Sequence, residues 1–309
     1  MLRPLESASH PDLLVGLLHG DDAAVWRRPE GRALIATVDF FTPIVDDAFT
    51  WGAISAANSA SDVYAMGGEP LFALNVVAWP KDVLPLSLLG DVLAGASATA
   101  TEGGWLVVGG HTIDGPEPMF GQVVIGEAAA DEILTNVGAR AGDWLVLTKP
   151  LGTGVISTAL KRLESKSAAL TASYQAAVAS MTTLNSGAAQ VARAASASAC
   201  TDVTGFGLAG HLHKMALGSG VAVDLDMAAL PLLPGVHQLI DDGFVPGGTH
   251  RNLEWLSEHL TGGSQRDRLV VADPQTSGGL LFACATPPAG ATVIGRCIAG
   301  TPGQIRIHL

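Results

Sequence analysis

The sequence has few basic residues and few cysteines, and each shortage excludes a class of protein. It contains 17 Lys and Arg against 29 Asp and Glu, so the formal net charge is −12, which argues against binding to duplex nucleic acid. The three cysteines, Cys200, Cys284 and Cys297, include no C-x-x-C pair. This weighs against structural zinc or a disulfide framework and favours a reducing compartment. No apolar run reaches transmembrane length, and the first residues lack the apolar core of a signal peptide. We therefore expect a cytoplasmic protein with neither nucleic-acid nor membrane partners.

The length and the pattern of apolar segments indicate two mixed domains. A chain of 309 residues with 48% hydrophobic and only 15% charged residues can bury a sizeable core and favours two domains over one. Segments typical of strands and of helices alternate in both halves, which predicts an α/β or α+β protein. The glycine-containing segment Asp131–Gly142, with its mixed charges, is the expected boundary.

The stretch Asp39–Pro70 organises the amino-terminal half. It follows the apolar run Ala33–Val38, which predicts a buried strand with Asp39 at its carboxyl end. The next residues are mostly Ala and Ser, with Thr50 as the expected N-cap and Gly67 as the expected C′ residue of a helix.

Two polar residues of that helix are spaced to lie on one face. Asn58 and Asp62 are four residues apart, which places both on the same side of a helix. With Asp39 at the neighbouring strand end, they predict a site for a metal ion and phosphate.

Five aspartates occur in turns or at element ends, beside glycine or small residues: Asp21, Asp22, Asp39, Asp62 and Asp202. Mg²⁺ takes hard oxygen ligands and commonly combines one or two carboxylates with substrate phosphates. Any single Asp is more often a helix cap or a solvated turn residue. Carboxylates that converge repel each other unless a cation lies between them, so for the set a metal site is the favoured interpretation.

Two glycine-rich turns are candidates for phosphate contacts through backbone N–H groups: Gly109–Thr112 after a strand, and Thr204–Gly207 before a helix. The first matches neither the P-loop nor the dinucleotide-binding consensus, so its spacing proves little by itself. For the second, an ordinary glycine-containing turn is the alternative. His111 alone is more typical of a structural hydrogen-bonding residue, and Lys149 is expected to be a solvated loop lysine. A predicted helix carries His211 and His213, which are two residues apart and face different ways, so we do not expect them to bind a metal.

Longer strings make the interpretation more specific. The chain contains, in this order, DFFTPIVDD, NSASDVYAMGGEP, GGHTIDGPEP, TKPLGTG, TDVTGFG and DPQTSGG. Together they resemble the selenophosphate synthetase (selenide, water dikinase) family, from Asp21 to about Ile307. The resemblance implies the two-domain α+β fold of aminoimidazole ribonucleotide synthetase-like ATP enzymes and a homodimer in which the amino-terminal sheets form a barrel. Residues 1–138 would bind ATP and metal and dimerise, and residues 139–309 would form an α+β domain that completes the site.

The resemblance also implies an activity and roles for individual residues. The family converts ATP, water and selenide to selenophosphate, AMP and orthophosphate with Mg²⁺, and whether a selenium-delivery protein is a partner stays open. The implied metal ligands are Asp22, Asp62 and Asp202. The implied nucleotide and phosphate contacts are Asp21, Asp39, Asn58, Asp62, Gly110, His111, Thr112 and Thr204.

One departure leaves the catalytic residues unassigned. The family carries, upstream of the Asp21–Asp22 turn, a glycine-rich segment with a reactive Cys or selenocysteine and an essential Lys, whereas Met1–Gly20 contains neither. The sequence is expected to begin after that segment. Cys284 lies in an apolar strand, and Cys200 is the cysteine nearest to the predicted site. Three explanations stay open: the core of a synthetase whose segment is missing, an enzyme that handles selenium or ATP by another route, and a non-catalytic ATP-binding or regulatory homologue. A related ATP enzyme with another substrate, such as a thiamine phosphate kinase, is the weaker rival.

Overall fold

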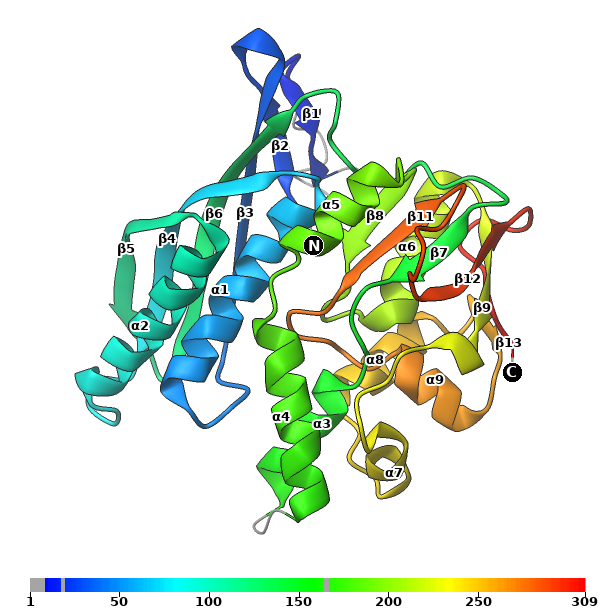
Figure 1. The fold of residues 1–309 in the computed structure, drawn as a ribbon. Helices are drawn as coiled ribbons and strands as arrows, with labels where there is room; N and C mark the ends of the chain where they lie inside the picture. Colours follow the sequence, from blue (N-terminus) through cyan, green and yellow to red (C-terminus); the bar gives the residue numbers. More distant parts are fainter. Residues whose placement is uncertain (1–8, 18–19, 164–166, 309) are drawn as a thin grey trace. The chain divides into compact units, whose positions relative to one another are not determined.

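The computed structural model describes residues 9–17, 20–163 and 167–308, so the leader Met1–Gly20 lies partly outside the described residues. The chain forms two compact units (Figure 1). The first comprises residues 1–133 and 182–189, and the second comprises residues 134–181 and 190–309. Each unit has its own sheet and its own helices, which confirms the expected α+β class.

The first unit contains a six-stranded sheet in the order β1-β2-β3-β6-β4-β5. Only β4 and β5 are parallel, and α2 connects them, while all other neighbours are antiparallel. The elements are β1 (Leu13–Val15), β2 (Ala24–Arg27), a 3-10 turn (Pro29–Gly31), β3 (Arg32–Phe41), α1 (Ala48–Ala65), β4 (Glu69–Trp79), α2 (Leu86–Gly103), β5 (Leu106–Asp114) and β6 (Met119–Ala129).

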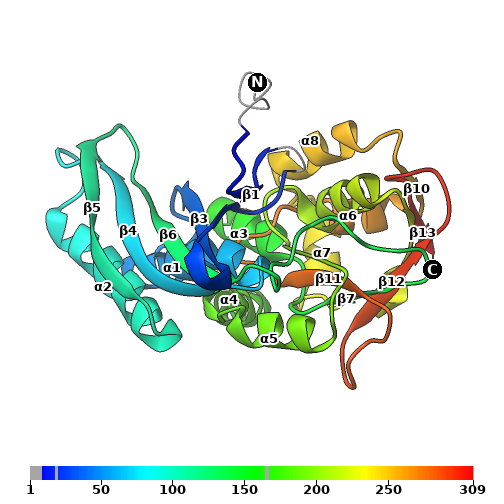
Figure 2. The same cartoon turned by 90° about the horizontal axis from the view of Figure 1, so that it is seen from above.

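Helices α1 and α2 pack together on one face of this sheet (Figures 1 and 2). Small residues allow the close approach: a Cβ on Gly52 would lie 1.9 Å from the Val92 carbonyl oxygen, and a Cβ on Gly95 would lie 1.9 Å from the Phe49 carbonyl oxygen. The Ala- and Ser-rich composition of α1 therefore serves tight packing, and most of α1 is buried.

The second unit contains a seven-stranded mixed sheet in the order β10-β13-β9-β12-β7-β11-β8. Its strands are β7 (Trp144–Leu147), β8 (Ala199–Asp202), β9 (Ala222–Asp226), β10 (Leu260–Gly262), β11 (Leu280–Cys284), β12 (Val293–Ile298) and β13 (Ile305–His308). The helices that follow Leu147 are α3 (Thr153–Arg162), α4 (Ala168–Thr182), α5 (Ser186–Ala194), α6 (Gly207–Ser219), a 3-10 turn (Met227–Ala229), α7 (Val236–Asp241), α8 (Gly247–Trp255) and α9 (Gln265–Val271).

Several predicted boundaries were wrong, each for a physical reason. The N-cap of α1 is Asp47, whose Oδ1 accepts a hydrogen bond of 2.8 Å from the Thr50 N–H, so the helix begins before Thr50. The other end of α1 was predicted correctly: Gly67 follows the C-cap residue Met66 and has φ +76°, as a C′ glycine does. The predicted strand at Trp105–Val108 continues as β5 to Asp114. Gly109 and Gly110 have φ of +148° and +152°, and the pairing with β4 resumes at Gly110 after a register shift.

The predicted helix Ser167–Ala199 is two helices, α4 and α5. Asn185 interrupts it: this residue is buried and donates a hydrogen bond of 2.8 Å to Ser61 Oγ. Helix propensity cannot locate a break that a tertiary hydrogen bond determines. No helix among the described residues is long and apolar enough to span a membrane.

The contact between α1 and α2 gives a test with an internal control. Gly95→Ala would place a Cβ 1.9 Å from a backbone oxygen and should lower the free energy of unfolding by about 1–3 kcal/mol. Gly90→Ala, on the same helix with nothing within 4 Å of the new Cβ, should be neutral or stabilising by about 0.5–1 kcal/mol. Urea denaturation of both variants measures the difference, and equal effects would contradict the close approach.

Candidate metal and nucleotide site

Two pairs of polar side chains meet between β3 and α1 in the first unit. Asn58 Nδ2 donates a short hydrogen bond to Asp39 Oδ2, and Thr37 Oγ1 donates a short hydrogen bond to Asp62 Oδ2. Four residues rise about 6 Å along a helix, and two residues rise about 6.6 Å along a strand. The spacing of Asn58 and Asp62 therefore matches the spacing of Asp39 and Thr37, with helix and strand running in opposite directions.

Thr37 also lies among these polar residues, although it was not among the predicted site residues. Its hydroxyl holds the Asp62 carboxylate and also lies 3.4 Å from the Asp22 carbonyl oxygen. The signal was present in the sequence, since Thr37 is two residues before Asp39 and so lies on the same face of the strand.

Asp39 lies within β3, two residues before its end, rather than after it. Burial raises the pKa of its carboxyl group, while the Asn58 hydrogen bond acts in the opposite direction. Ser59 fixes the backbone here: its Oγ donates to the Asp39 carbonyl at 3.0 Å and accepts from the Gln122 N–H at 3.2 Å. Helix α1 thus binds both the side chain and the backbone carbonyl of Asp39.

Asp21 and Asp22 line a pocket of ≈ 560 Å³ in the first unit. They lie in the turn before β2, as expected. Thr37 is a further polar residue of the pocket lining, and Leu17 and Val123 are among its apolar residues. The pocket has the size and the mixed lining of a small-molecule site.

The residues Gly110, His111 and Thr112 lie elsewhere on the same sheet. They are exposed on β5, the edge strand, and β6 and β4 separate β5 from β3. Gly110 has a structural explanation, because a Cβ there would lie 2.2 Å from the Asn75 carbonyl oxygen of β4. One copy of the sheet therefore does not bring this group to Asp39 or Asp62.

In the second unit Asp202 is the last residue of β8 and is buried. Thr204 follows, and its N–H donates to His211 Nε2 at 3.1 Å, so this amide already has an acceptor. Burial lowers the pKa of His211 to about 3, which keeps the ring neutral and able to accept. His211, which we did not expect to be a metal ligand, instead shapes the turn after Asp202.

Lys149 is buried, which corrects the prediction of a solvated loop lysine. Only 7% of it is exposed, and its Nζ donates to the Ser277 carbonyl oxygen at 3.0 Å. Burial lowers the pKa of Lys149 to about 8, although the negative charge of Asp202 opposes the shift. No local sequence pattern indicates this burial, since the Ser277 carbonyl is distant along the chain.

The strings TKPLGTG and DPQTSGG pack against each other at the start of α3. Gln275 Oε1 accepts hydrogen bonds from the N–H groups of Gly152 at 3.0 Å and Thr153 at 3.2 Å, and Asp273 Oδ2 accepts from Val155 at 3.4 Å. Burial raises the pKa of Asp273 to about 7. Because side chains of this unit cap α3, its amino terminus is not an anion site.

The three cysteines are buried. Burial raises the pKa of the Cys284 thiol, and it raises the pKa of Cys297 to about 12. A thiol with a raised pKa is a poor nucleophile near neutral pH, as expected for Cys284. Cys200 lies in β8 with no exposed surface.

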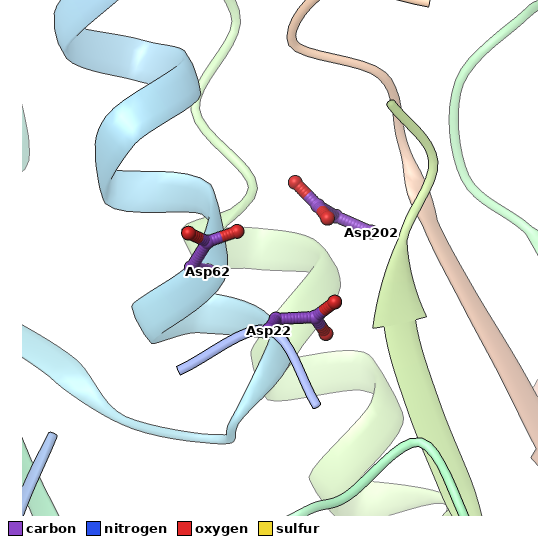
Figure 3. A group of neighbouring side chains, drawn as sticks. All are labelled: Asp22, Asp62 and Asp202. Atoms are coloured by element: carbon purple, nitrogen blue, oxygen red, sulfur yellow. The ribbon is translucent and has the colours of Figure 1, made fainter. Parts of the chain in front are cut away.

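Three of the predicted carboxylates form one group. Asp22, Asp62 and Asp202 each offer one oxygen, and these oxygens lie within 4.8 Å of one another (Figure 3). Carboxylate oxygens are the ligands that Mg²⁺ prefers, and negative charges this close repel unless a cation lies among them. The donor set therefore fits a divalent, oxygen-preferring cation.

Family models match both parts of the chain. The AIR synthase related protein N-terminal domain matches residues 20–128, and the corresponding C-terminal domain matches residues 140–308. Among curated relatives, the selenide, water dikinase of Citrifermentans bemidjiense is 46% identical over 97% of this chain and 87% of its own length. The selenide, water dikinase of Myxococcus xanthus is 45% identical over 98% of this chain and 90% of its own length.

Solved structures share the fold at lower identity. Thiamine monophosphate kinase from Aquifex aeolicus has a TM-score of 0.72 at 19% identity, covering 99% of this chain and 94% of that one. Hydrogenase maturation protein HypE in complex with ATP has a TM-score of 0.63 at 18% identity, covering 99% of this chain and 85% of that one. At these identities the likeness concerns the fold.

Proposed function

The chain belongs to the selenide, water dikinase family, and we propose that it converts ATP, water and selenide to selenophosphate, AMP and orthophosphate. The observation that carries this is the 46% identity to a selenide, water dikinase over 97% of the chain. The retained carboxylates support it, because a chain that no longer bound a metal–nucleotide complex would have no physical reason to keep charges that repel. The same retention argues against a pure scaffold.

We propose Asp22, Asp62 and Asp202 as the ligands of Mg²⁺. Bound Mg²⁺ would neutralise the charge of the ATP phosphates, which phosphoryl transfer requires. Thr37 would hold Asp62 in one orientation through its short hydrogen bond. Rigid carboxylates cost little reorganisation when charge develops, which is the main source of rate enhancement at such sites.

The nucleotide contacts are likewise proposals. Asp39, oriented by Asn58, and Asp21, in the pocket wall, would contact ATP through hydrogen bonds or a further bound cation. Thr204 would contribute its hydroxyl, since its N–H donates to His211. Gly110, His111 and Thr112 would contact phosphate. In this way an acidic chain can bind a polyanion.

Anaerobic phosphorus NMR of the chain with ATP, Mg²⁺ and selenide tests the activity. Selenophosphate should appear together with AMP and orthophosphate in equal amounts. ATP consumption without selenophosphate would contradict the proposed acceptor and would indicate an intact phosphoryl-transfer site that lacks selenide handling. No ATP consumption would contradict the enzymatic assignment.

Removing one metal ligand should weaken nucleotide binding. Asp62→Asn or Asp202→Asn deletes a carboxylate, and we expect Mg²⁺-dependent ATP affinity to fall roughly tenfold or more, because even changes outside the ligand sphere of a metal cost about 10–100-fold. Isothermal titration calorimetry measures this. Asp91→Asn, at an exposed position of α2, is the matched control. Wild-type affinity in both test variants would remove these residues from the site.

We also propose that a second copy of the chain covers the sheet face opposite α1 and α2. Register and exposure place large apolar side chains on that face: Val38 is 55% exposed, Leu106 68% and Val108 56%. Phe40 and Leu74 lie on the same face. Patches of this kind mark interaction sites. A second copy would also explain how Gly110–Thr112, on the distant strand β5, could reach a carboxylate site: it would be the site of the other copy.

If this sheet face forms the dimer interface, a charged side chain introduced there should separate the two copies. Val108→Glu should convert a dimer to a monomer in sedimentation velocity and should lower ATP affinity as well. Leu217→Glu, at a position on α6 that is 54% exposed, should change neither property. A wild-type chain that sediments as a monomer at high micromolar concentration would refute the dimer.

A further inference from the structure

Lys149 is a buried cation that the proposed metal and nucleotide contacts do not use. It is 7% exposed, whereas lysine is almost never fully buried unless its ammonium is paired. Removing an ammonium from water is costly. If the loop after β7 only connected two elements, a lysine exposed to solvent would be sufficient there. The burial of Lys149 therefore indicates a role for its ammonium.

The sheet topology brings Lys149 and Asp202 to the same edge. Strand β11 lies between β7 and β8 and is antiparallel to both (Figure 1). Leu281 pairs with Leu147 and Leu280 pairs with Asp202, so the ends of β7 and β8 flank the start of β11. Lys149 is two residues beyond β7, and Asp202 ends β8. Adjacent strands are about 4.8 Å apart, so the two ends are about two strand spacings apart, within reach of a lysine side chain.

The turn before β11 presses against both strand ends. A Cβ on Gly279 would lie 2.3 Å from the Lys149 backbone N, and a Cβ on Gly278 would lie 2.0 Å from the Val203 carbonyl oxygen. Two backbone hydrogen bonds of 3.0 Å fasten the turn, from Thr148 N to the Leu280 oxygen and from Val203 N to the Gly279 oxygen. Only glycine permits this contact, so the two glycines of DPQTSGG hold Lys149 and the residue after Asp202 in fixed positions.

Ser277 also supports the ammonium. It has φ +47°, a conformation that non-glycine residues adopt at a cost, and its carbonyl accepts the hydrogen bond from Lys149. This hydrogen bond fixes the positive charge at the sheet edge where β8 ends in Asp202, a proposed metal ligand.

We propose that the Lys149 ammonium binds a phosphate oxygen of ATP in the metal–nucleotide complex. The assignment rests on the proposed function, because it needs a bound nucleotide. It gives the carboxyl-terminal unit two complementary contacts with the same ligand: Asp202 binds the metal ion, and Lys149 binds the phosphate directly. Charge-assisted hydrogen bonds are roughly twice as strong as neutral ones, and phosphoryl transfer depends on such neutralisation.

The test compares Lys149→Met and Lys149→Gln with the wild type by titration calorimetry with Mg²⁺ and ATP. Loss of one charge-assisted hydrogen bond should lower ATP affinity roughly tenfold to hundredfold. Gln keeps an N–H donor for the Ser277 carbonyl, so it removes the charge with less disturbance of the turn. Lys161→Met, at an exposed position of α3 in the same unit, is the control and should bind ATP like the wild type.

A role limited to balancing the charge of Asp202 predicts a different result. In that case both Lys149 variants would bind Mn²⁺ more tightly without nucleotide, as measured by electron paramagnetic resonance, and their ATP affinity would be unchanged or higher. That outcome overturns the proposal. If both neutral variants lack a cooperative thermal transition while Lys149→Arg keeps one, the charge serves folding and the proposal is likewise overturned.

The wild type separates this proposal from the proposed function. If it binds Mg²⁺ and ATP and forms selenophosphate while the neutral Lys149 variants keep wild-type affinity, only the Lys149 assignment fails. If the wild type does not bind ATP, the proposed function fails, and the Lys149 assignment fails with it.

Discussion

The repulsion among buried and half-buried carboxylates is the constraint on which the site depends. Asp22, Asp62 and Asp202 offer oxygens within 4.8 Å of one another, and such an arrangement disfavours the folded chain unless cations or donors compensate. The Thr37 hydroxyl donates to Asp62 of this group, and the Asn58 amide donates to another carboxylate of the same unit, Asp39. Folding and ligand binding are therefore linked, since a cation that binds this group stabilises the folded state.

Glycine and other small residues perform a second task, which is to let backbones approach. The same explanation holds for Gly95 between two helices, Gly110 between two strands and Gly279 against Lys149. Glycine-rich strings in nucleotide-binding proteins suggest phosphate cradles, yet each of these three glycines is accounted for by a neighbouring backbone or side chain. The chemical contribution of Gly95 and Gly279 is indirect, because they set where other side chains lie, whereas Gly110 is also a proposed phosphate contact.

The sequence alone predicted the class of fold and most of the elements around the site, while the roles of Asp22, Asp62 and Asp202 stay predictions. Those predictions rest on local signals: apolar runs, caps, and the four-residue spacing of Asn58 and Asp62. It could not predict the break at Asn185, the burial of Lys149 or the position of His111. Each of these depends on contacts between segments distant along the chain: Ser61 with Asn185, Ser277 with Lys149, and the strand order that places β5 at the edge. Thr37 is intermediate. The sequence places it on the same strand face as Asp39, but its hydrogen bond to Asp62 could not be predicted.

The match between β3 and α1 restricts how the length of this region can vary. A residue inserted between Asn58 and Asp62 would rotate Asp62 by about 100° around the helix and move its carboxylate away from Thr37. A residue inserted in the connection between Phe41 and Asp47 would leave both spacings intact. Insertions and deletions compatible with the site are therefore confined to this connection. The spacing from Asn58 to Asp62 in α1 and from Thr37 to Asp39 in β3 cannot change.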